Sequence, residues 1–301
     1  MAINDTIDFE LFRYSPSQAA AGLFAALFLA TTAVHIHQLV KSRPRAWYFT
    51  PFVIGGLFQI TGYTIRIPTH TNPESVPLFA TQGILILLAP PLYAATIYMV
   101  LGRPITFLNS EHLSLIPVKW TTKVFVTGDI LAFLMQVAGA GIMSAGSNSV
   151  DSYKTGENVT VAGLGVQLAF FGFFTVTCVV FHRRMRRNST ATAGAEEKPN
   201  GTLRGQSWES VLLALYTVSG LILVRSVFRL VEYIQGNDGY LISHEVFMYV
   251  FDAALMFLVM VVMNVWHPSG VLGGSWMGRK GDAESLELDS SLRELQAQSQ
   301  S

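Results

Sequence analysis

Charged side chains are scarce in this sequence. Only 13% of its 301 residues are Asp, Glu, Lys or Arg, whereas 50% are hydrophobic. A soluble domain normally carries about a quarter charged residues, so the deficit indicates a membrane protein. The 20 basic residues are balanced by 20 acidic residues. The chain therefore lacks the net positive charge that attracts nucleic acid, and nucleic acid is not an expected partner.

Cysteine and the common enzyme motifs are also lacking. The one cysteine, Cys178, lies in an apolar run, so no intramolecular disulfide forms. The sequence contains neither the phosphate-binding loop G-x-x-x-x-G-K-[ST] nor the hydrolase elbow G-x-S-x-G. The last apolar segment has no lysine for a retinal Schiff base, and no two histidines are spaced i, i+4. We therefore expect no ATPase or hydrolase activity, no metal and no cofactor.

Long apolar runs dominate what remains. A membrane-spanning helix needs roughly 20 mainly apolar residues. Seven segments meet this condition: Ala19–Val40, Trp47–Ile67, Val76–Val100, Thr122–Ser144, Val161–Phe181, Trp208–Leu230 and Glu245–Trp266. The sequence predicts an all-α integral membrane protein with a seven-helix transmembrane domain over residues 19–267.

The basic residues predict its orientation. They gather after the first, third, fifth and seventh segments, for example at Lys41, Arg103, Arg183 and Arg279. Basic loops remain in the cytosol, so residues 1–18 are predicted to be extracellular and the C-terminal tail cytosolic. Polar composition further predicts a flexible cytosolic loop over residues 188–206 and a disordered tail over residues 268–301.

Ten polar or ionisable side chains lie where hydrocarbon is expected. They are Arg66, Asp129, Gln136, Gln167, Arg225, Arg229, Glu232, Glu245, Tyr249 and Asp252. Arg225, Arg229 and Glu232 are spaced i, i+4, i+7 and share one helix face. Glu245, Tyr249 and Asp252 have the same spacing. A charge inside the bilayer costs at least about 2.5–3.5 kcal/mol, so such residues are usually paired and functional.

Two interpretations of this set are open. The first is a substrate-binding polar pocket or groove, lined by the second, fourth, sixth and seventh helices and open to the outer side or outer leaflet. The second is a structural network of ion pairs, Arg229 with Glu232 and Arg225 with Asp252. In addition, Pro90 and Pro91 remove backbone donors in the third segment and predict a hinge there.

Several motifs carry a family resemblance. They are Gly62-Tyr63-x-x-Arg66, Leu88-Ala89-Pro90, Gly128-Asp129 with Gln136, Gly163-Leu164-Gly165-x-Gln167, Arg225-Ser226-x-Phe228-Arg229-x-x-Glu232-Tyr233-x-Gln235-Gly236, and then Glu245, Tyr249, Asp252 and His267-Pro268. In this order they resemble the fungal RTA-like, or lipid-translocating exporter, family. The resemblance implies a seven-helix membrane protein that exports or translocates lipids, notably sphingoid long-chain bases, and that contributes to resistance against toxic amphiphiles.

We therefore expect a transporter whose partners are membrane lipids and amphipathic small molecules, located in the plasma membrane or, alternatively, in the vacuole or another endomembrane. Its carboxylates would meet an ammonium group, and its arginines would balance those carboxylates or meet a phosphate. Two other classes fit the same residues: a seven-helix lipid receptor or regulator, and a membrane-embedded enzyme that acts on a lipophilic metabolite. A homo-oligomer is compatible with the sequence, which identifies no regulatory partner.

Overall fold

The computed structural model describes residues 14–42, 47–107, 116–145, 150–192, 208–236 and 239–266. Every regular element in these ranges is helical. The elements are α1 (Gln18–Lys41), the 3₁₀ turn η1 (Trp47–Phe49), α2 (Thr50–Thr69), α3 (Val76–Phe107), α4 (Val118–Ala145), α5 (Val150–Thr192), α6 (Trp208–Ile234), α7 (Glu245–Met248), the π-helical turn η3 (Tyr249–Ala254) and α8 (Leu255–Val265). The last three follow one another without a break.

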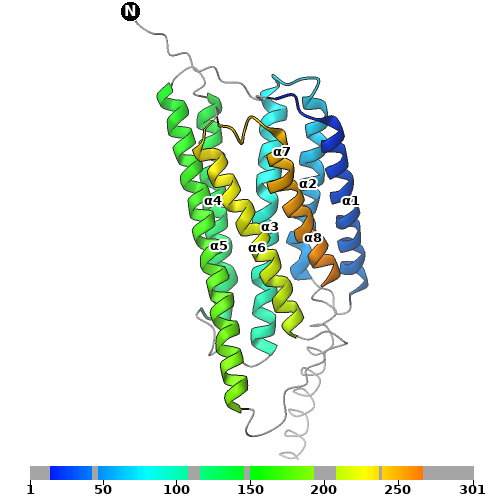
Figure 1. The fold of residues 1–301 in the computed structure, drawn as a ribbon, viewed down its shortest axis with the longest axis vertical. Coiled ribbons are helices and arrows are strands. Elements are labelled where there is room, and N and C mark those ends of the chain that lie inside the picture. Colours follow the sequence, from blue (N-terminus) through cyan, green and yellow to red (C-terminus); the bar gives the residue numbers. More distant parts are fainter. Residues whose placement is uncertain are drawn as a thin grey trace, which may run out of the picture.

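The helices form one bundle of rods that run side by side (Figure 1). Each rod from α1 to α6 packs against the next, and α8 packs against both α6 and α1, which closes the bundle into a ring. Besides its neighbours α2 and α4, helix α3 also contacts α5 and α6, so it lies closest to the centre of the bundle. The ends at which α1 begins, α2 finishes and α7 begins lie together, at the top of Figure 1.

Six of these rods are long and apolar enough to cross a membrane: α1, α3, α4, α5, α6 and the rod from α7 to α8. This supports an integral membrane protein. The second predicted span, α2, has 20 residues but does not reach the same hydropathy. It carries Gln59 and Arg66, both buried, together with several Gly and Thr residues. Gln59 and Arg66 are buried in the bundle rather than exposed to lipid, so the mean hydropathy of α2 understates how well it fits a membrane.

Helix α5 departs most from the prediction. It has 43 residues, about 65 Å of helix, and extends about 11 residues beyond each end of the predicted segment Val161–Phe181. Its lower end projects past the neighbouring helices in Figure 1. The expected loop 188–206 is helical as far as Thr192, because apolarity marks only the part of a helix that lipid covers and not where the helix ends. Residues 193–206, 1–13 and 267–301 lie outside the described residues, and with them most of that loop and of both predicted terminal segments.

Helix α3 continues through Pro90 and Pro91 from Val76 to Phe107. The two prolines therefore do not end the helix, and the hinge stays a prediction.

Helices α4 and α5 approach each other closely through glycine. A Cβ atom added to Gly139 would lie 2.6 Å from the Gly156 carbonyl oxygen and 2.7 Å from the Thr160 backbone nitrogen. A Cβ atom on Gly156 would in turn lie 2.6 Å from the Gly139 carbonyl oxygen. Only glycine on both helices permits this distance, as is common between membrane helices. By contrast, a Cβ atom on Gly141 would meet nothing within 4 Å.

We predict that Gly139→Val destabilises the protein by about 1–3 kcal/mol, because the backbones of α4 and α5 would have to separate. Gly141→Val is the matched control, because Gly141 lies two residues further along α4 and its added Cβ atom faces open space. This variant should unfold like the wild type. SDS-induced unfolding in mixed micelles measures both. Equal stability of the two variants would contradict the close approach.

Candidate functional site

The ten polar side chains singled out by the sequence form, with their partners, three groups. The first lies at one end of the bundle and centres on Arg66. The second, the core ion-pair cluster, consists of Arg225, Arg229, Glu232 and Asp252. The third joins α3, α4 and α5. Each group uses residues from different helices, and each has its own hydrogen bonds.

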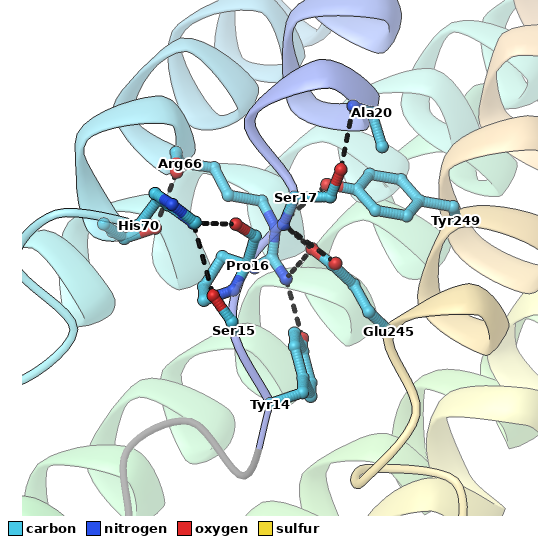
Figure 2. A network of polar contacts seen from close by, with 10 residues as sticks. Tyr14, Ser15, Pro16, Ser17, Ala20, Arg66, His70, Glu245 and Tyr249 are labelled. Atoms are coloured by element: carbon cyan, nitrogen blue, oxygen red, sulfur yellow. Dashed lines mark hydrogen bonds and ion pairs between the residues drawn. The ribbon is translucent and has the colours of Figure 1, made fainter.

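The end network is built on Arg66, which lies in the last turn of α2 and is 3% exposed. Its Nη2 donates to Glu245 Oε1 at 2.9 Å and to the Tyr14 hydroxyl at 2.7 Å, while its Nε donates to the Tyr249 hydroxyl at 3.3 Å. Figure 2 shows the Arg66 side chain reaching between these partners. One guanidinium group thus links the start of the chain, α2 and the final helical rod.

The segment Tyr14–Ser17 lies across this end of the bundle (Figure 2). The Ser17 backbone nitrogen donates to both Glu245 carboxylate oxygens, at 2.9 and 3.1 Å. The Ser17 hydroxyl accepts from Ala20 N and so caps α1. A hydrogen bond of 2.8 Å joins His70 Nδ1 to the Pro16 carbonyl oxygen. Burial raises the pKa of the Tyr14 phenol, which therefore stays neutral as it accepts from Arg66.

The core ion-pair cluster lies deeper in the bundle. Arg225 Nε donates to Asp252 Oδ1 at 2.8 Å, and Arg225 Nη2 donates to Oδ2 at 3.4 Å, with both side chains at most 1% exposed. Arg229 Nη1 donates to Glu232 Oε2 at 2.7 Å, and Arg229 Nε lies 3.8 Å from Asp252 Oδ2. Both ion pairs expected from the structural interpretation are therefore present. Asp252 joins them into one cluster.

A π-helical turn positions part of this chemistry. Tyr249 and Asp252 both belong to η3 and are both buried, while Glu245 begins the same rod in α7. A π turn widens the helix by one extra residue and occurs often at functional sites. Here it follows Glu245, the partner of Arg66, and contains Asp252, the partner of Arg225, so it helps to set the relative position of the two ion pairs. Regular α-helical spacing contains no signal for such a turn.

The third group is separate from the arginines. The Tyr98 hydroxyl of α3 donates to Asp129 Oδ2 of α4 at 2.9 Å, and Gln136 Nε2 donates to Gln167 Oε1 of α5 at 2.9 Å. All four side chains are buried. Within the described part of the chain, no hydrogen bond or ion pair joins this group to the core ion-pair cluster. The residues expected to line one pocket therefore belong to separate hydrogen-bonded groups, because shared spacing on one helix does not reveal which helices face each other. The pocket itself stays a prediction.

The charges of the first two groups balance. Three arginines (Arg66, Arg225 and Arg229) meet three carboxylates (Glu232, Glu245 and Asp252). A buried pair in good geometry avoids the cost of an isolated charge. No cluster of three His, Cys, Asp or Glu side chains that could hold a metal ion occurs in the ranges that the structure describes.

Several contributors were not expected. Tyr14, Ser17 and His70 join the end network from outside the helix interiors, where no hydropathy signal marks them. In the sequence, Tyr98, the partner of Asp129, cannot be distinguished from an ordinary aromatic residue of the core. The sequence does contain a signal for Gln59 as a buried polar residue. Gln59, Tyr63 and Arg66 have the same i, i+4, i+7 spacing as the two polar triplets of the sixth and seventh predicted helices.

We predict that Arg225→Met and Asp252→Leu each cost about 3–5 kcal/mol of unfolding free energy, because each removes the closest partner of a buried charge. The double variant should recover most of that loss, since it removes both charges. A double-mutant cycle in mixed micelles measures the coupling. Additive losses would contradict a direct pair.

Comparisons with known proteins give consistent results. A family model described as "RTA1 like protein" matches residues 52–275. The "Protoporphyrin uptake protein 1" of Saccharomyces cerevisiae is 35% identical over 290 residues, which covers 85% of this chain and 91% of that protein.

Two relatives are named as transporters. The "Probable lipid transporter atnI" of Emericella nidulans is 34% identical over 266 residues, covering 87% of this chain and 68% of that protein. The "Sphingoid long-chain base transporter RSB1" of Saccharomyces cerevisiae is 26% identical over 265 residues, covering 80% and 69%. No solved structure matches the chain.

Proposed function

Because the chain belongs to the RTA1-like family, we propose that it is a membrane transporter that moves amphipathic lipids, such as sphingoid long-chain bases, or toxic amphiphiles across the bilayer. The core ion-pair cluster is the observation that carries this proposal. It places two arginines and two carboxylates inside an apolar bundle, where a lipid headgroup needs a polar path. The names of the two transporter relatives support the substrate class.

The proposed topology has seven spans, with α2 as the second span and the rod from α7 to α8 as the seventh. The N-terminus is outside, and the protein lies in the plasma membrane. In this orientation the end network marks the outer end of the bundle. The segment Tyr14–Ser17 then covers the outer ends of α2 and α7, and Pro90 and Pro91 allow α3 to bend below it.

The proposed mechanism is an exchange of ion-pair partners. Each carboxylate is already bound by a guanidinium group, so an entering ammonium group would replace an arginine rather than fill a vacant position. The displaced arginine would then meet a phosphate, or a second carboxylate such as Asp252, which lies near both Arg225 and Arg229. The net charge of the interior stays close to zero during the exchange, which limits the cost of moving a headgroup through hydrocarbon. The acyl chain remains in the lipid.

We infer that headgroup contact belongs to Arg66, Glu245 and Tyr249 at the outer end and to the core ion-pair cluster below it. The group Asp129, Gln136 and Gln167 would hold α3, α4 and α5 together. Its side chains hydrogen-bond in neutral or singly charged pairs and lack a cation among their described hydrogen-bond partners.

The topology predicts which ends of the bundle can be labelled. In a Cys178→Ala background, Ser15→Cys should react with a membrane-impermeant maleimide in intact cells, because Ser15 is exposed at the outer end. Lys41→Cys, exposed at the other end of α1, should react only after permeabilisation. The reverse pattern would contradict the orientation. Reaction of both only after permeabilisation would contradict the plasma membrane as its location.

Transport is predicted to depend on the carboxylates. In liposomes that contain only the purified protein, Glu232→Gln and Asp252→Asn should each slow the movement of fluorescent sphingoid bases about tenfold or more, because each removes a charge-assisted partner. Lys123→Gln removes an exposed charge over Trp120 and should leave the rate unchanged.

Folded wild-type protein that moves no sphingoid base, lysophospholipid or phospholipid, with or without a proton gradient, would overturn the proposal. Ligand-dependent signalling without lipid flux would then identify a receptor. A product of altered mass would identify an enzyme.

A further inference from the structure

The middle of α2 carries an amide with no hydrogen-bond partner. Gln59 is fully buried, and neither its Oε1 nor its Nε2 has a partner among the described residues. The hydroxyl of Tyr63, also fully buried, lacks a partner as well, and so does the hydroxyl of Thr32, which is 1% exposed. A membrane interior has no bulk water to satisfy such groups. An unpaired buried polar group of this kind therefore calls for an explanation.

The three side chains lie near one another. Gln59 and Tyr63 are four residues apart and share a face of α2. One turn before Gln59, a Cβ atom on Gly56 would collide with Thr32 Oγ1, so Thr32 of α1 lies against that turn. One turn after Gln59, the ring of Tyr63 stacks on Phe28 of α1 with centroids 5.5 Å apart. Thr32 and Phe28 thus bracket the level of Gln59. We call Thr32, Gln59 and Tyr63 the mid-depth cluster.

The mid-depth cluster continues inward from the end network. Gln59 is the tenth of the 20 residues of α2, and it lies about 10 Å along the helix axis from Arg66 on the same face. Tyr63 lies between the two, with its ring 6.2 Å from that of Tyr249. A headgroup that passes Arg66 and moves along this face of α2 would therefore reach the cluster next.

The cluster differs from its surroundings in charge. Arg66, Arg225 and Arg229 and their carboxylates are already engaged in ion pairs, although Arg229 Nε makes no hydrogen bond among the described residues. The groups without partners in the mid-depth cluster are an amide and two hydroxyls. The unused hydrogen-bonding capacity of the mid-depth cluster is thus uncharged. An amide can donate and accept at once, and each hydroxyl can do either. Such a set matches a hydroxyl or amide group better than a bare ammonium ion, which can only donate.

We propose that Thr32, Gln59 and Tyr63 form an uncharged hydrogen-bonding site that binds the hydroxyl or amide groups of a transported amphiphile. The inference rests on the proposed transport function and assigns part of its substrate selectivity. The ion pairs accommodate the charge of the headgroup, and the mid-depth cluster hydrogen-bonds to the neutral groups beside that charge. An amphiphile with hydroxyls next to its amine is therefore a better substrate than a simple long-chain amine.

Two probes of equal chain length test this inference. Sphinganine carries an amine and two hydroxyls, whereas octadecylamine carries the amine alone. We expect liposomes with the wild-type protein to move sphinganine about tenfold faster than octadecylamine, which corresponds to about one hydrogen bond. In Gln59→Leu the ratio of the two rates should fall to about one. Tyr63→Phe, which keeps the ring and its stacking, should lower the ratio in the same direction.

Thr61→Val is the matched control. Thr61 lies on the same helix, is exposed, and bonds only its own backbone at Leu57 O. Its variant should keep the wild-type ratio. A fall of the ratio, rather than of both rates together, distinguishes recognition from damage to the fold.

Two results would overturn the inference, and they differ from each other. Equal rates for the two probes in the wild type, or an unchanged ratio in both Gln59→Leu and Tyr63→Phe, would mean that the cluster holds only water, and transport itself would still stand. Movement of neither probe, nor of any lysophospholipid or phospholipid, by folded wild-type protein would remove the proposed function together with this site.

Discussion

The pairing of buried charge is the constraint on which the rest of the structure depends. A guanidinium group in hydrocarbon is tolerated only with a partner, and Arg225 finds Asp252 on another helix, with both almost completely buried. That requirement fixes the rotation of α6 against the rod from α7 to α8. Arg66 imposes a similar condition at the end of the bundle, where it holds α2 against Glu245. Apolar packing fills the bundle, but it could be satisfied by many rotations of each helix. The ion pairs are compatible with only a few of these rotations.

The sequence predicted the parts that follow from chemistry repeated along one helix. Apolar length located each helical rod that the structure describes, and the spacing of Arg225, Arg229 and Glu232 correctly indicated a shared face and two ion pairs. It could not predict contacts between helices, so Asp129 was grouped with arginines from which the structure separates it. It also could not predict the full length of α5, because the polar ends of that helix resemble loops in composition. The π turn at Asp252 left no trace in the spacing.

The two kinds of buried polarity in the bundle have complementary properties. Ion pairs such as Arg225–Asp252 are strong and directional, and opening one requires a replacement charge. Amide and hydroxyl groups such as those of Gln59 and Tyr63 bind more weakly and accept many geometries. A path that alternates between them would hold a headgroup firmly enough to discriminate and loosely enough to release it. In the proposed transport function, this division would also separate two selectivities, one for charge and one for neutral hydrogen-bonding groups.

The bond between Ser17 and Glu245 also has a consequence for biosynthesis. These residues are 228 positions apart in the sequence, and Arg66 is 179 positions from the same carboxylate. While the ribosome is still making the middle of the chain, α1 and α2 are already complete, and Arg66 has no acidic partner in the final rod. Ring closure is therefore the last step of assembly. A chain that stops early exposes an unmatched cation in its second helix, a chemical mark by which a cell could distinguish unfinished copies from finished ones.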